Sequence, residues 1–549
     1  MAMISDSDLA TRGRAALEHH QWRDAFDLLS QADAAGELDP PGLALLADAA
    51  WWTGQLPRAI EARERAYAGA TRGGDIETAV AAAIVLAREN LLRNAHSVAN
   101  GWLQRGERLL ADLPENAAHG WLAAIRSFYA AVTGQSELAL TEAERAYDIG
   151  RRLGNHDLEV LGLSEKGAAL LTRGDLQAGL AAVDEATAVA VSGELEPVTA
   201  GGVCCTTIES CAALGDWRRA AEWTEAQDRW ARREGLNGYP GMCRLFRSDV
   251  KRLRGAWLEA ESEARRASDE LLGYIPAAVG QAYYQIGQIR LLRGDLEGAE
   301  EALLQGHGFG RDPEPTLSLL RLAQGKLDEA SDGIRRALVE PPLSPSWSAP
   351  SDSELYRLTL LPAQVEIAVA AGDLATAGTA TATLTELAGR FDTLASRANA
   401  ALARGTLALA QGDAAVAGRE LRQAVRWWTE LDAPYEAAQA RYQLGRSLAA
   451  DGATDAATRE LRTAADALEQ LGAAPAARRA ADALAAIPGV SSPTPERGRT
   501  RVTRAFMFTD IVNSTGIAEG LGDAEWDRLL RWHDDTLRSI VVEFGGEEV

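Results

Sequence analysis

A pattern of small and apolar residues recurs along most of the chain with a period close to forty. Each copy has a Gly, often an Asp next, then an apolar residue, and a small residue five positions after the Gly. RGDLQAGLAAVDEA at Gly174, LGDWRRAAEWTEA at Gly215 and AGDLATAGTATATL at Gly372 are clear copies. Gly174 and Gly215 are 41 residues apart. A period of this length indicates stacked helical hairpins.

Further copies of the pattern fill most of the chain. They stand at Gly54, Gly134, Gly255, Gly294, Gly325, Gly412 and Gly452. Asn94 occupies the corresponding place between Gly54 and Gly134, and Asn is the residue after Gly that best tolerates a left-handed backbone. A degenerate copy, HQWRDAFDLL, starts at His20. We therefore expect about twelve units between residue 5 and residue 486.

Each unit predicts two helices joined by a tight turn. The Gly ends the first helix because it adopts a positive φ without strain. An Asp after it caps the second helix by accepting free amide protons. The small residue one turn later allows the second helix to pack closely on the first, and apolar residues at helical spacing bury the pair.

The repeat resembles the tetratricopeptide (TPR) family, most closely the longer units of large LuxR-type bacterial activators. The resemblance implies a mostly α fold, an α-solenoid in which antiparallel helix pairs form a right-handed superhelix with a concave groove. TPR-like arrays bind peptides, proteins or small ligands, so we expect a protein or small-ligand partner in the groove. Trp22, Trp217 and Trp257 each stand two residues after the turn position, and we interpret all three as core residues.

The texture of the chain changes after the repeats. Residues 488–501, PGVSSPTPERGRTR, are rich in Pro, Gly and Arg and predict an extended linker. Val502 to Phe508 then forms an apolar run typical of a buried strand, and helical spacing returns from about Asp523 to Phe544. We predict a repeat array over 1–487, a flexible linker over 488–501 and a separate segment over 502–549.

The stretch AFMFTDIVNST, residues 505–515, contains the end of this predicted strand, then an acid, Asp510, and then a polar turn. A carboxylate beside free turn amides can hold Mg²⁺ against nucleotide phosphates. Residues 508–515, together with LLRWHDDTLRSIVVEFGGEEV, resemble the opening of class III adenylate/guanylate cyclase catalytic domains, which implies the β-α start of an α+β, ferredoxin-like fold. By this resemblance Asp510 and the backbone carbonyl of Ile511 would bind Mg²⁺ or Mn²⁺. Asn513, Ser514 and Thr515 would hold the triphosphate of ATP or GTP.

The cyclase resemblance implies a reaction in which the ribose 3′-hydroxyl attacks the α-phosphate and pyrophosphate leaves, within a homodimer. In that family a Lys and a Gly-Asp-Gly motif with the second metal ligand follow beyond the position of Val549. We therefore expect this chain, as it stands, to form no cyclic nucleotide alone. Two other functions are considered for the chain. It could be a TPR scaffold with a vestigial cyclase segment, or a relative of LuxR-type transcription regulators, although no C-terminal helix-turn-helix is evident.

Composition narrows the remaining function classes. The chain of 549 residues carries 79 acidic and 56 basic side chains, a net charge of −23, which disfavours non-specific nucleic-acid binding. Its four cysteines lack CxxC spacing, and no apolar run reaches the roughly 18 residues of a membrane helix, so we expect a cytoplasmic protein. The glycine-rich stretch over 306–310 lacks the strand and helix of a phosphate-binding loop, and we interpret it as a loop between repeats.

Overall fold

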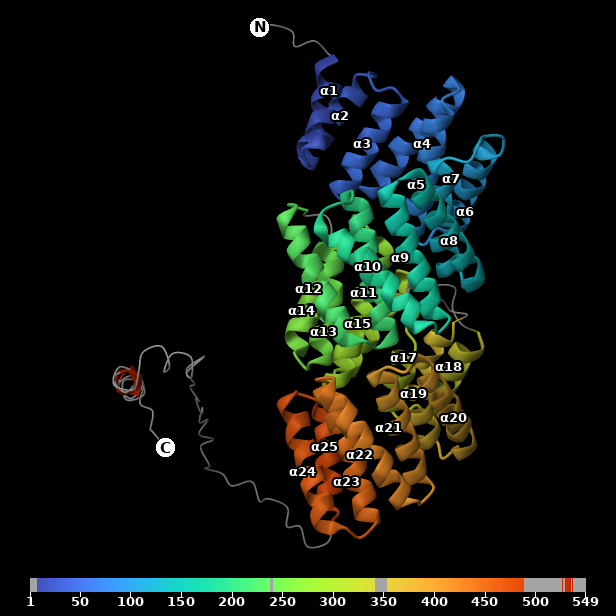
Figure 1. Cartoon of the computed structure of the whole chain (residues 1–549). Helices are drawn as coiled ribbons and strands as arrows, with labels where there is room; N and C mark the ends of the chain where they lie inside the picture. Colours follow the sequence, from blue (N-terminus) through green and yellow to red (C-terminus); the bar gives the residue numbers. More distant parts are fainter. Residues whose placement is uncertain are drawn as a thin grey trace. The chain divides into compact units, whose positions relative to one another are not determined.

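The computed structural model describes residues 7–236, 240–340 and 353–487, together with positions 526, 529–534 and 536. By internal contacts the chain separates into two units, Met1–Val490 and Ser491–Val549. The described part of the first unit is an array of helices that follow one another from α1 to α25 (Figure 1). No helix among the described residues is both long and apolar enough to cross a membrane.

The helices of the array are short and similar in length. Their bounds are α1 Ser7–Glu18, α2 Trp22–Ala34, α3 Pro40–Trp52, α4 Leu56–Gly73, α5 Ile76–Leu91, α6 His96–Leu110, α7 Ala117–Val132, α8 Ser136–Leu153, α9 His156–Thr172, α10 Leu176–Ser192, α11 Pro197–Leu214, α12 Trp217–Arg233 and α13 Pro240–Leu253. They continue with α14 Trp257–Leu271, α15 Pro276–Arg293, α16 Leu296–Gly308, α17 Thr316–Ala323, α18 Leu327–Val339, α19 Glu354–Ala370, α20 Leu374–Phe391, α21 Leu394–Ala410, α22 Ala414–Glu430, α23 Pro434–Ala450, α24 Thr454–Gln470 and α25 Ala474–Ala485.

The predicted turn positions are confirmed in all twelve hairpins of this described array. Each hairpin pairs an odd-numbered helix with the next even-numbered one, from α1–α2 to α23–α24, and α25 packs on the last pair. The ten glycines of the pattern all have positive φ, and so do His20 at 56° and Asn94 at 59°. The degenerate copies at these two residues are therefore genuine members of the repeat.

The caps and the small residues also behave as the pattern predicts. The Asp373 carboxylate accepts a hydrogen bond from the Thr376 amide at 3.0 Å, and Asp413 accepts one from Val416 at 2.9 Å. The residue five positions after each turn is buried in every hairpin. The set is Ala25, Ala59, Ala99, Ala139, Gly179, Ala220, Ala260, Ala299, Ala330, Ala377, Ala417 and Ala457. The predicted α-solenoid of TPR-like hairpins is thus confirmed for the described array.

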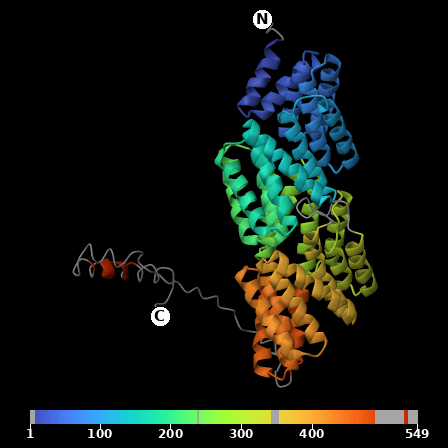
Figure 2. The same cartoon turned by 45° about the vertical axis from the view of Figure 1, so that its right-hand side comes forward.

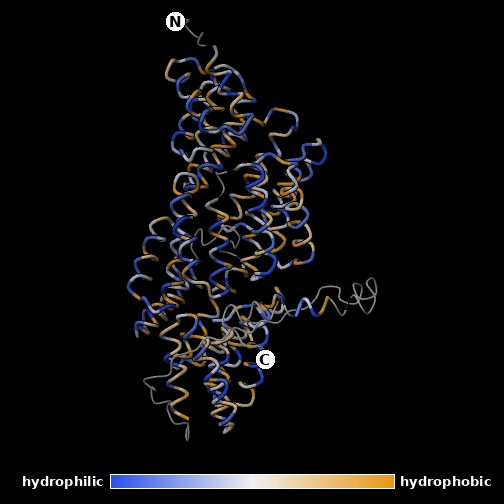
Figure 3. Tube along the Cα trace, turned by 90° about the vertical axis from the view of Figure 1, so that its left-hand side faces the viewer, coloured by the Kyte–Doolittle hydropathy of each residue, from blue (hydrophilic) through white to orange (hydrophobic). Residues whose placement is uncertain are grey.

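Neighbouring helices pack side by side along the array (Figure 2), and hydrophobic and hydrophilic residues are interspersed along the chain (Figure 3). Because each helix contacts the one before and the one after it, buried residues form a series of linked clusters rather than one central core. The largest fully buried side chains, which include Trp230 and Phe391, belong to different clusters.

The superhelix also contacts itself after about one turn. The Leu56 amide donates to the Gly273 carbonyl at 3.2 Å, although 217 positions separate them, and the Tyr274 hydroxyl donates to the Trp52 carbonyl at 3.1 Å. Asn94 Nδ2 donates to the Phe309 carbonyl at 3.1 Å. In each case the tight turn inside one hairpin is hydrogen-bonded to a connection between two hairpins that lie five to six units later in the chain. These contacts close the first turn of the superhelix on itself.

Some sequence-based interpretations fail in the array. The predicted loop over 306–310 is wrong for Gly306 to Gly308, which form the end of α16. A Cβ on Gly306 would lie 2.9 Å from the Gly280 carbonyl oxygen, so this glycine allows α15 and α16 to pack closely. Trp257 is 2% exposed, as expected of a core residue, whereas Trp22 lines a cavity and Trp217 is only partly buried.

The predicted cyclase segment lies almost entirely outside the described residues. This holds for the strand over 502–508 and for the candidate site residues Asp510, Ile511, Asn513, Ser514 and Thr515. The linker over 488–501 lies outside them as well. The described positions 526, 529–534 and 536 are helical, within the stretch where the sequence predicts a helix. The assignment of the domain bounds and the cyclase site stay predictions.

Candidate ligand-binding cavity

A cavity of about 1130 Å³ lies within the first superhelical turn. Its walls come mainly from the first helices of successive hairpins, α3, α5, α7, α9 and α11, with contributions from α1 and α2. In a helical-repeat array these helices line the concave face. Met242 of α13 and Ile275, in the connection from α14 to α15, complete the lining. Since this connection is bonded to the α3–α4 turn, the self-contact of the superhelix helps to enclose the cavity.

One end of the cavity wall is aromatic. Trp22 stacks on Trp52 with ring centroids 4.7 Å apart. The His20 ring also stacks on Trp22, with centroids 4.8 Å apart. Trp51 meets Trp52 edge to face at 4.8 Å. The α7 helix adds Trp121 and Phe128 to the lining. The stacked rings arise because the first hairpin turn places Trp22 two residues after His20, beside the end of α3.

The charges that line the cavity are strongly unbalanced. Seven carboxylates face one guanidinium. The carboxylates are those of Glu18, Asp48, Glu77, Asp157, Glu165, Glu196 and Glu209, and the guanidinium is that of Arg88. Arg88 lies 5.8 Å from the centre of the Trp51 ring, in a cation–π arrangement. Because carboxylates outnumber guanidiniums in this lining by six, the cavity favours a positively charged guest over an anion once the carboxylates are ionised.

Two of the seven carboxylates already have partners within the protein. Asp48 pairs with Arg63 at 2.8 Å, and Arg63 also contacts the buried Glu89 at 3.2 Å. The Asp157 carboxylate accepts a hydrogen bond from the Glu196 amide at 3.0 Å, which joins the start of α9 to the start of α11. These contacts fix the cavity wall, and the Arg63 guanidinium partly neutralises the Asp48 carboxylate.

Glu165 of α9 and Glu209 of α11 stand out among the lining groups. The two helices pack against each other, and both side chains are half-buried because their remaining exposed surface faces the cavity. Glu165 is hydrogen-bonded to Thr206. Burial raises the pKa of Glu165 to about 7. Burial and the neighbouring Glu165 charge raise the pKa of Glu209 to about 8. Among the described residues no cation contributes to either pKa.

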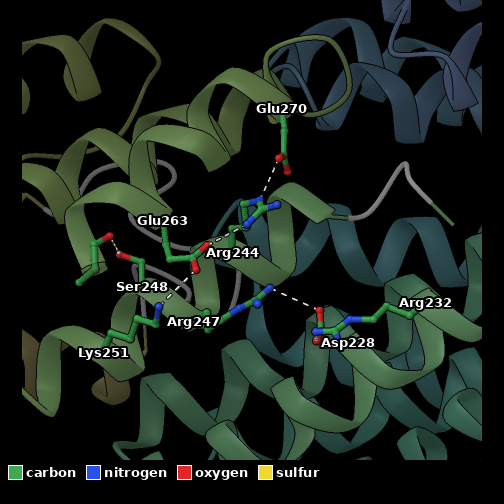
Figure 4. A network of polar contacts seen from close by, with 9 residues as sticks. Asp228, Arg232, Arg244, Arg247, Ser248, Lys251, Glu263 and Glu270 are labelled. Atoms are coloured by element: carbon green, nitrogen blue, oxygen red, sulfur yellow. Dashed lines mark hydrogen bonds and ion pairs between the residues drawn. The ribbon is translucent and has the colours of Figure 1, made fainter. Parts of the chain in front are cut away.

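The next hairpins show how this chain normally treats partly buried charges. Figure 4 shows a network in which residues of α13 pair with residues of α12 and α14. The Arg244 guanidinium contacts Glu263 at 3.1 Å and Glu270 at 2.8 Å, and the Lys251 ammonium contacts Glu263 at 3.3 Å. These partners lower the pKa of Glu263 even though burial opposes the shift. The lack of any such cation beside Glu165 and Glu209 is therefore a distinctive property of the cavity.

Cys205 also lines the cavity, but its environment gives it no catalytic character. Burial raises the thiol pKa well above its usual range, so the thiol stays protonated and is a weak nucleophile. The Gln227 amide nitrogen lies 3.8 Å from its sulfur. The described residues also contain no group of three or more His, Cys, Asp or Glu placed to hold a metal ion. The arrangement supports binding, and these features supply no catalytic or metal chemistry.

Sequence reasoning did not identify the cavity residues. One signal could have drawn attention to Glu209, because it is the only charged residue in PVTAGGVCCTTIESCAAL, the sequence of α11. A single acid in a helix that is otherwise uncharged marks a position with a special environment. The contribution of Trp22 could not be predicted in this way, because its place after the turn also suits a core residue.

The fold and cavity together define a helical-repeat protein with a partly open, acidic and aromatic-lined cavity. No protein-family model matches the chain, and no curated protein matches it. Among solved structures it is similar to the APC/C hetero-tetramer Cut9–Hcn1, at 13% identity and a TM-score of 0.46, over 88% of this chain and 97% of that one. It is also similar to yeast Tom70, at 13% identity and a TM-score of 0.31, over 86% of this chain and 95% of that one. At these scores the likenesses carry no argument about function.

Proposed function

We propose that this protein is a binding scaffold whose helical array receives a guest in the cavity of its first superhelical turn. The observation that carries the proposal is the cavity itself. It combines a large volume, stacked indole rings and carboxylates without cationic partners in one concave space. Ligand sites typically have volumes of roughly 300–1,000 Å³, with apolar walls and a few convergent polar groups. A volume of about 1130 Å³ suits a guest at the upper end of this range.

A variant that fills the cavity tests this function. Ala81 of α5 lines the cavity and has an exposed side chain, so Ala81→Trp can place an indole in the space without disturbing the packing between helices. Ala188→Trp on α10 is the matched control, because Ala188 is exposed and does not line the cavity. Both variants and the parent are screened by thermal shift against one library of cationic, anionic and neutral small molecules.

We expect a subset of compounds to raise the Tm of the parent and of Ala188→Trp but not of Ala81→Trp. A guest present at one hundred times its Kd stabilises the folded state by about 2.7 kcal/mol, which a thermal shift detects readily. If no compound separates Ala81→Trp from the control, the cavity does not serve as a binding site and the proposal is wrong.

A second function rests on the sequence of residues 508–515 and concerns cyclic-nucleotide signalling. We propose that Asp510 and the Ile511 carbonyl bind Mg²⁺ or Mn²⁺ and that Asn513 to Thr515 hold ATP or GTP, in a cyclase homodimer regulated by the repeat array. The support for this proposal is the resemblance of the sequence alone. The reading frame that follows codon 549 tests it: a Lys and then Gly-Asp-Gly in frame would support a cyclase, and their absence would leave the binding scaffold.

If the frame continues, the encoded protein is assayed for cyclic nucleotide with Mn²⁺ and ATP or GTP. The expected result is product formation that Asp510→Ala abolishes. Product formation that persists in Asp510→Ala would contradict the role assigned to this carboxylate.

A further inference from the structure

We propose that the guest of the cavity is a small organic cation, with an ammonium, phosphonium or guanidinium group joined to flat apolar groups. This inference rests on the proposed binding function and specifies its ligand class. The positive group would be held by Glu165 and Glu209, and the apolar part by the aromatic wall.

The charge balance of the lining is the first argument for a cation. Glu165 and Glu209 lie on adjacent helices, face the same enclosed space and have no cationic partner among the described residues. A carboxylate removed from water without a partner is costly to ionise, and a bound cation removes much of that cost. Elsewhere in the array, as around Glu263, the protein supplies the cation from its own side chains.

The aromatic wall is the second argument. The faces of indole rings attract cations, and Trp51 already shows this with Arg88 at 5.8 Å. Trp121 and Phe128, which are partly exposed, offer further ring surface within the same cavity. A guest with both a positive charge and a flat apolar part would use both kinds of surface at once. A simple metal ion would use neither the rings nor the volume.

The contact between the first superhelical turn and the connection from α14 to α15 favours a compact molecule over an extended basic peptide. The connection between α14 and α15 is bonded to the turn between α3 and α4 through the Leu56 amide and the Tyr274 hydroxyl. Ile275 of the same connection lies in the cavity wall. An extended peptide along the concave face would have to pass this contact, whereas a compact guest fits within a volume of about 1130 Å³.

Binding of a permanent cation should then become stronger as the pH rises. The two glutamates ionise in the neutral range, with pKa values of about 7 and about 8, so both are charged at pH 9 and mostly neutral at pH 6. The other titratable or charged groups that line the cavity are Glu18, His20, Asp48, Glu77, Arg88, Asp157, Glu196 and Cys205. Because burial keeps the Cys205 thiol protonated across this range, this group does not oppose the trend.

The test uses two probes of nearly equal size and shape but opposite charge, tetraphenylphosphonium and tetraphenylborate. Their binding to the full chain is measured by isothermal titration calorimetry at pH 6 and pH 9, in 0.15 M salt to screen the surface charge. The variants are Glu165→Gln with Glu209→Gln, and the control Glu225→Gln. Glu225 is an exposed residue of α12 that does not line the cavity.

We expect one tetraphenylphosphonium per chain at pH 9, bound at least tenfold more tightly than tetraphenylborate. The double variant should lose at least tenfold in phosphonium affinity, and the control should lose nothing. The parent should lose a similar factor between pH 9 and pH 6, which tests the inference even if the double variant does not fold.

Two results would overturn the inference. The first is equal or tighter binding of tetraphenylborate, and the second is no binding of tetraphenylphosphonium at all, including the case in which only a basic peptide binds. Neither result would by itself contradict the proposed binding function, which the Ala81→Trp screen decides separately. If that screen also finds no compound, both proposals fail.

Discussion

Replacing the two cavity glutamates by glutamine should stabilise the protein at alkaline pH and leave it nearly unchanged at acidic pH. Each side chain has a pKa of 4.5 in the absence of the fold, and the folded protein raises it to about 7 for Glu165 and about 8 for Glu209. A carboxyl whose pKa is raised by folding contributes full stability below pH 4.5. That stability is lost as the pH rises through the folded pKa, because the unfolded chain ionises first.

The size of the effect follows from the two shifts. At about 1.36 kcal/mol per pKa unit, the change from pH 5 to pH 8 costs the fold about 2.5 kcal/mol through Glu165 and about 3.5 kcal/mol through Glu209. Because the Glu209 value already includes the charge on Glu165, the two ionisations are successive steps, and the pair costs more than Glu209 alone, up to about 6 kcal/mol in this pH range.

The assay is urea unfolding of the parent, the Glu165→Gln and Glu209→Gln double variant, and the Glu225→Gln control, at half-unit steps from pH 5 to pH 9. Unfolding is followed by tryptophan fluorescence, since Trp121 and Trp52 lie beside the cavity. The gain of the double variant over the parent should increase by at least about 3.5 kcal/mol between pH 5 and pH 8. If the free energies of unfolding of the parent and the double variant ran parallel as a function of pH, the reasoning would be refuted, because both carboxylates would then titrate normally.

Two further predictions concern the packing of the array. Gly150→Ala should destabilise α8 and α9 by about 2 kcal/mol in urea unfolding, because its Cβ would lie 2.4 Å from the Glu159 amide nitrogen. The control Gly389→Ala has open space around the new Cβ and should be neutral or slightly stabilising, and equal effects of the two changes would contradict this. Asn94→Gly should cost about 1 kcal/mol through its lost hydrogen bond to the Phe309 carbonyl. Asn94→Ala should cost about 1 kcal/mol more through its positive φ, and equal unfolding midpoints for the two variants would refute that assignment.

The local rules of the repeat could be predicted from the sequence because their causes are local. A turn with a left-handed residue, an Asp that caps the next helix and a small residue at the helix contact all act within a few positions of one another. This is why even the degenerate turns at His20 and Asn94 were identified correctly. The extent of α16 was missed because Gly306 is fixed by the carbonyl of Gly280 on another helix, a contact that leaves no trace in the spacing of the repeat.

The cavity depends on contacts that no local pattern records. Gly273 approaches the Gly54 carbonyl oxygen so closely that a Cβ would lie 2.2 Å from it, and this contact joins residues 219 positions apart. The small rotation from one hairpin to the next decides whether such a contact forms, and it accumulates from many packing details. The packing of α9 on α11 makes Glu165 and Glu209 neighbours, but the wall opposite them forms only when the superhelical turn has closed. Their function is therefore a property of the superhelix, and the repeat motif reveals the wall of the cavity without revealing what the wall surrounds.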